Sequence, residues 1–67
     1  MDSIVKNSNI LLNKMYLGCK YTYHELQRIC NLSETQLCFA IMSLLRDGKI
    51  CQYRDSDVVY ELIPNNK

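Results

Sequence analysis

Residues 22–36 read TYHELQRICNLSETQ and contain two helix-start signals in close succession. Each signal is a capping box, in which a threonine or serine side chain accepts a hydrogen bond from the backbone N–H three residues later. The glutamate or glutamine side chain at that later position accepts a second hydrogen bond from the backbone N–H of the threonine or serine. Thr22 and Glu25 form the first box, and Ser33 and Gln36 form the second. Asn31 lies between them and tolerates the left-handed conformation that ends a helix. The sequence therefore predicts two helices joined by a very short turn.

The second of these helices, from about residue 34 to residue 47, has two dissimilar faces. When residues are placed at about 100° per step, one arc is apolar and contains Leu37, Ala40, Ile41, Leu44 and Leu45. The opposite arc contains Thr35, Gln36, Phe39, Met42, Ser43 and Arg46, with Cys38 at the border. Gly48 follows as the residue that ends the helix.

Two further elements flank this pair. An amphipathic helix is expected over about residues 2–17, with Ile10 pointing away from a core face made of Ile4, Ser8, Leu11, Leu12 and Met15. Residues 19–21 form a brief extended piece. After the last helix, two runs of strand character surround the turn cluster 55–57 and predict a hairpin over about 49–63, with Tyr53 facing Tyr60 across it. Residues 65–67 are expected to fray.

These faces predict one hydrophobic core in one domain, residues 1–67. Its expected members are Leu11, Leu12, Leu26, Ile29, Leu37, Ile41, Leu44, Ile50, Tyr60 and Leu62.

Composition narrows the class of protein. The chain has 67 residues, of which 48% are hydrophobic and 22% charged, as in globular domains. The net charge of +1 excludes a polybasic or acidic tail. No apolar run approaches the roughly 20 residues of a membrane span, and the N-terminus lacks the apolar core of a signal peptide. We therefore expect a cytoplasmic protein with no membrane partner.

The order of helix, short strand, helix, tight turn, helix and hairpin resembles the winged helix-turn-helix family over nearly the whole length. The resemblance is carried by residues 21–26, 32–33, 37 and 44–50. The last of these, LLRDGKI, is similar to the end of the third helix in small stand-alone bacterial winged-helix proteins. The resemblance implies a mainly α fold with a small β-hairpin, a helix-turn-helix over about 22–47 and a wing over about 49–63.

It also implies a DNA-binding module, a small transcriptional regulator whose third helix enters the major groove of double-stranded DNA. Such a monomer would bind weakly, so a homodimer or a protein partner is expected to contribute. The positions that match the family's DNA-contacting surface are Thr35, Gln36, Ser43, Arg46, Lys49 and Arg54.

The outer face of the third helix departs from that pattern. Cys38, Phe39 and Met42 stand where polar or basic residues are common in the family, and residues 19–63 carry five basic against six acidic side chains. DNA binding normally needs several clustered cations. The alternative function is a winged helix used as a protein-interaction or dimerisation module without DNA binding. Cys38, Phe39 and Met42 would then form its interface. Burial of this patch under another element, and contacts between the patch and thymine methyl groups, also remain open.

Nothing in the sequence predicts an enzyme, a cofactor or a metal. His24 is the only histidine, and Cys19, Cys30, Cys38 and Cys51 lack the close-set pairs of a structural zinc site. We expect the cysteines to be reduced and mostly buried thiols. No catalytic residue is predicted.

Overall fold

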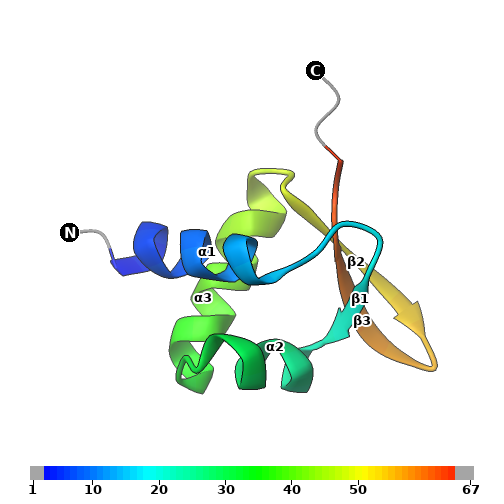
Figure 1. Cartoon of the computed structure of the whole chain (residues 1–67), viewed down its shortest axis with the longest axis horizontal. Coiled ribbons are helices and arrows are strands. Elements are labelled where there is room, and N and C mark those ends of the chain that lie inside the picture. The colour runs from blue at the N-terminus through cyan, green and yellow to red at the C-terminus, as the bar shows by residue number, and fades with distance from the viewer. Residues whose placement is uncertain (1–2, 65–67) are drawn as a thin grey trace.

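The computed structural model describes residues 3–64, which form three helices and three strands (Figure 1). In chain order these are α1 (Ser3–Lys14), β1 (Lys20–Thr22), α2 (Tyr23–Cys30), α3 (Glu34–Arg46), β2 (Ile50–Asp55) and β3 (Asp57–Leu62). Roughly half of the chain is helical. Asp2, the predicted start of the first helix, and residues 65–67, predicted to fray, lie outside the described residues.

The architecture is α+β rather than mainly α with an isolated hairpin. β1 pairs with β3, so the hairpin becomes part of a three-stranded antiparallel sheet in the order β1-β3-β2. The predicted extended piece thus supplies a third strand. Its central pair, Tyr21 opposite Tyr60, joins residues that lie far apart in the sequence.

Both predicted capping boxes are confirmed. The Thr22 and Ser33 N–H groups donate to Glu25 Oε1 at 2.9 Å and to Gln36 Oε1 at 3.1 Å. The Thr22 and Ser33 hydroxyls in turn accept hydrogen bonds from the backbone N–H groups of Glu25, at 3.1 Å, and Gln36, at 3.2 Å. Asn31 adopts a left-handed conformation with φ of 56° and donates its N–H to the Gln27 carbonyl. Local hydrogen bonds therefore restrict the α2–α3 connection to residues 31–33.

The predicted pairing of Tyr53 with Tyr60 is wrong. The hairpin turns at Ser56, whose φ is 49°, and this turn sets Tyr53 opposite Val59 and Gln52 opposite Tyr60. Because side chains alternate between the two faces of a sheet, Tyr60 points into the core and Tyr53 points away from it.

α1 is shorter than predicted and ends at Lys14 rather than near Leu17. The Tyr16 N–H donates to the Tyr21 hydroxyl at 3.0 Å instead of continuing the helical ladder. Tyr16 and Leu17 are 72% and 61% exposed. Gly18 then turns the chain toward β1 with φ of +84°, a conformation that costs glycine little.

One core lies between the helices and the inner face of the sheet. Its buried apolar members are Leu11, Met15, Leu26, Cys30, Leu37, Ala40, Ile41, Leu44, Ile50 and Tyr60. Leu12 and Leu62 are partly buried against it.

Three predicted orientations need correction. Ile29, predicted in the core, is 39% exposed, whereas Leu26 and Cys30 of the same helix are buried. Ile10 packs against the core rather than pointing away from it. Ile4 is 45% exposed, since the first turns of α1 extend beyond α3 (Figure 1).

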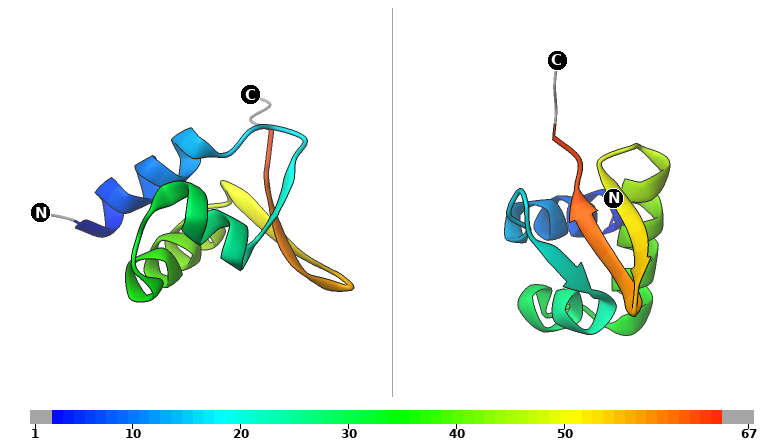
Figure 2. Two further views of the ribbon diagram at one scale, coloured as in Figure 1. Left: turned by 60° about the horizontal axis from the view of Figure 1, so that its bottom comes forward. Right: turned by 90° about the vertical axis from the view of Figure 1, so that its right-hand side faces the viewer.

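The helices leave one side of α3 uncovered. α1 packs against α3, and in the right-hand view of Figure 2 α3 lies along the right-hand edge of the molecule. Within residues 3–64, no helix has the length and apolar character needed to cross a membrane.

Candidate functional site

The uncovered side of α3 carries a row of side chains that we call the α3 stripe, made of Thr35, Cys38, Phe39, Met42 and Arg46. All five residues are exposed, and Phe39 and Met42 keep 49% and 56% of their surface in solvent. The residues on the other side of the helix, such as Leu37 and Leu44, are buried. Phe39 and Met42 therefore lie on the molecular surface, and the alternative in which another element buries them is wrong.

Two sulfur atoms make the middle of the stripe continuous. Cys38 Sγ lies 3.9 Å from Met42 Sδ, one helical turn further along. Phe39 lies beside them on the same face. Thioether and thiol groups are polarisable and adapt to irregular apolar surfaces. The stripe thus offers a contact surface that can adjust to a partner.

A groove runs beside the first half of the stripe. Tyr23, Glu34, Thr35, Cys38 and Phe39 line it, between the start of α2 and the first two turns of α3. The Tyr23 hydroxyl donates to the Glu34 carbonyl at 2.9 Å, which fixes one wall of the groove to the other. Partial burial, and then the neighbouring Cys38 and Glu34, raise the pKa of Tyr23. These surroundings therefore favour the neutral hydroxyl that donates to the Glu34 carbonyl.

The polar DNA-contact candidates on α3 differ in their exposure and in whether their side chains already accept a hydrogen bond. Thr35 is exposed and Ser43 is half-buried. Gln36 is exposed, but its side-chain oxygen accepts the capping bond from the Ser33 N–H. A bidentate contact with adenine uses both the oxygen and the nitrogen of the amide. The capping box therefore leaves only the amide nitrogen of Gln36 for a base.

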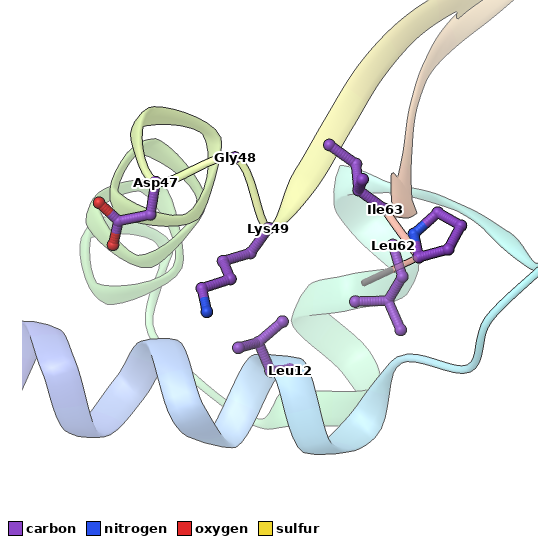
Figure 3. Close-up of a pocket in the computed structure, with 7 residues that line it drawn as sticks. Leu12, Asp47, Gly48, Lys49, Leu62 and Ile63 are labelled. Carbon is purple, nitrogen blue, oxygen red and sulfur yellow. The ribbon is translucent and has the colours of Figure 1, made fainter. Parts of the chain in front are cut away.

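The cationic candidates point in different directions. Arg46 is highly exposed, with Nε 3.8 Å from Asp47 Oδ1. The Lys49 side chain extends toward Leu12 of α1, in a pocket also lined by Leu62 and Ile63 (Figure 3). Arg54 lies near the hairpin turn, opposite Val58 and at the other end of β2 from Lys49. The structure thus brings Thr35 and Arg46 together with Cys38, Phe39 and Met42, and leaves Lys49 and Arg54 apart from them.

Sequence reasoning missed a polar cluster on the outer face of the sheet. Lys20, Glu61 and Cys51 lie side by side on β1, β3 and β2. The Lys20 ammonium lies 5.5 Å from the centre of the Tyr53 ring. Hydrogen bonding to Cys51, and then to Glu61, raises the pKa of Tyr53 to about 12. Only the strand register brings these residues together, so no local sequence signal could have revealed them.

The four cysteines are free, and two of them are exposed. Cys30 is buried, which raises the pKa of its thiol, and Cys51 is half-buried with its thiol directed at the Glu61 carbonyl. The prediction of mostly buried thiols is wrong for Cys19 and Cys38. Among the described residues, no three His, Cys, Asp or Glu side chains are grouped so that they could hold a metal ion.

Comparisons with protein families, with curated proteins and with solved structures gave no match for this chain. The role of the α3 stripe is therefore argued from its geometry and chemistry.

Proposed function

We propose that the chain is a winged helix-turn-helix domain whose α3 stripe and adjoining groove bind a protein. The observation that carries this proposal is the exposure of about half of Phe39 and of Met42 on one helix face, next to an open groove. Contiguous exposed apolar side chains mark interaction sites more often than scattered ones do. Aromatic residues, methionine and arginine are also the types enriched in protein interfaces, and Phe39, Met42 and Arg46 supply one of each.

The polar and charged groups around the stripe favour this role over reading a base sequence. Affinity for DNA comes largely from cations placed against phosphates. Of the three cationic candidates, Arg46 alone lies on the stripe, and Lys49 extends toward α1. Glu34 lies at the first turn of α3, where a phosphate would meet a negative charge.

A photo-crosslinking amino acid in place of Met42 tests the proposal in cells that express the full chain. We expect covalent adducts with protein, because the stripe would be in contact with its partner. The matched control places the same group at Asn9, an exposed position on α1. A position-42 variant that forms no protein adduct beyond those of the position-9 control would contradict the proposed function.

The second candidate function is a DNA-binding module acting as a small transcriptional regulator. It is favoured by the order of the elements, in which a short turn joins α2 to α3 and a hairpin follows α3 directly. Thr35, Arg46 and Arg54 are exposed and available to double-stranded DNA. For both candidates we propose a cytoplasmic location.

Titration with generic duplex DNA at low and at moderate salt tests the second candidate. If the chain binds, Arg54→Ala should weaken binding to all sequences alike and reduce the salt slope by about one, as expected for the loss of one phosphate contact. Arg28→Ala is the control, since Arg28 is an exposed arginine on α2 outside the candidate surface. Any sequence preference should depend on Gln36. Absence of binding at low salt would remove this candidate.

A further inference from the structure

Helix α3 carries opposite charges at its two ends, with Glu34 beside the α3 stripe in the first turn and Arg46 on the stripe in the last turn. Glu34 opens the helix and Arg46 closes it, and the eleven residues between them carry no charge. Apolar Phe39 and Met42 lie near the middle. Such a helix has an acidic first turn, an apolar centre and Arg46 in its last turn, so a second copy running in the opposite direction would bring Glu34 of each copy near Arg46 of the other.

We infer that the partner of the stripe is the α3 stripe of a second copy of this chain, packed antiparallel about a two-fold axis between Phe39 and Met42. This inference rests on the proposed function. In this arrangement Phe39 of each copy lies opposite Met42 of the other, and Thr35 lies opposite Arg46. A two-fold interface uses the same patch on both copies, so the patch must be complementary to itself.

The spacing of the stripe suits helix–helix contact. Thr35, Phe39, Met42 and Arg46 follow one another at intervals of four, three and four residues. This alternation keeps the side chains on one seam when two helices cross at about 20°. All four side chains are exposed, so the seam is accessible.

The groove beside the stripe is placed to receive a side chain of the second copy. It lies along the first half of α3, whereas Met42 lies in the second half. An antiparallel pairing brings Met42 of each copy to Phe39 and the groove of the other. Tyr23 holds the groove in shape through its bond to the Glu34 carbonyl. A flexible methionine can fill such an irregular space.

The terminal charges select the antiparallel arrangement. It brings Glu34 of each copy close to Arg46 of the other, within one residue of the helical register, or about 1.5 Å along the axis. A parallel pairing would instead place like charges together. Arg46 is available, because its ion pair with Asp47 is long and exposed.

Charge reversal tests the inference on the full chain by sedimentation. We expect the natural chain to form a dimer as its concentration rises. Glu34→Arg and Arg46→Glu should each weaken self-association by about tenfold or more, because each variant places two like-charged pairs in the interface. An equimolar mixture of the two variants should recover the dimer, since their charges then match, and so should the double variant. Arg28→Glu, on α2, is the control that keeps the dimer.

Circular dichroism confirms that each variant is folded before its mass is measured. A natural chain that stays monomeric at every concentration would overturn the inference, while crosslinks from position 42 to another protein would still support the proposed function. A dimer that neither single variant weakens would overturn the antiparallel arrangement. So would single variants that dissociate but fail to recover when mixed.

Discussion

Tyr53 shows how strand register alone can change the chemistry of one side chain. Cys51 on the same strand, and then Glu61 on the neighbouring strand, favour the neutral phenol and raise the pKa of Tyr53 to about 12 from 10.0. We predict that Cys51→Ala lowers the pKa of Tyr53 toward its ordinary value. Phenolate absorbance during a pH titration measures this shift, and Tyr53→Phe identifies which step belongs to Tyr53.

The raised pKa of Tyr53 also determines how the stability of the folded chain responds to alkaline pH. Because the pKa of Tyr53 is higher in the folded chain than in the unfolded one, its contribution to folding is fully present below pH 10. That contribution is lost as the pH rises from about 10 to about 12. Tyr53→Phe should therefore reduce the fall in stability over this range in urea denaturation series. A natural chain in which every tyrosine titrates near pH 10 would contradict this account of the sheet face.

Among the secondary-structure elements, α2 depends most on its cap, because it has only eight residues. An isolated helix of that length is unstable in water. Thr22→Ala removes the side-chain acceptor of the Glu25 N–H and should cost about 1 kcal/mol of unfolding free energy, measured by urea denaturation. His24→Ala, an exposed change in the same turn, should stay within about 0.5 kcal/mol. Equal effects of the two changes would show that the capping box does not stabilise α2.

The elements also show which parts of the structure the sequence could predict. Thr22, Ser33 and Asn31 act through residues at most four positions away, so the caps and the α2–α3 turn could be predicted from the chain alone. The side of α3 that faces outward could be predicted as well, because helical periodicity determines it. Strand register is a long-range property, set by the turn at Ser56 and by the pairing of β1 with β3. For that reason the predicted facing of Tyr53 and Tyr60 failed and the Cys51–Glu61 cluster went unseen.

The exposure of the candidate site, like the strand register, depends on contacts between residues that lie far apart in the sequence. The sequence placed Phe39 and Met42 on the outer arc of α3, but it could not show whether another element would cover them. That depends on how α1 and the sheet dock, and they dock on the other side of α3. Likewise, the exposure of Ile29 depends on how α2 packs against its neighbours.

At the level of the whole molecule, a 67-residue domain has a thin core and leaves much apolar surface outside it. Phe39 and Met42 are part of that surface, alongside Tyr16, Leu17 and Ile29. A second copy that covers the α3 stripe would bind the folded chain and not the unfolded one. Binding of this kind raises the melting temperature with concentration by mass action. We therefore predict that the melting temperature of the natural chain rises by a few degrees for each tenfold increase in protein concentration.

Two serine substitutions separate this effect from a general effect of apolar surface. Phe39→Ser removes the centre of the stripe and should make the melting temperature independent of concentration, while the chain stays folded because Phe39 lies outside the core. Ile29→Ser changes an exposed apolar residue on α2, away from the stripe, and should preserve the concentration dependence. Loss of the dependence in both variants would indicate association through scattered apolar contacts. Retention of it in Phe39→Ser would place the contact between copies on a surface other than α3.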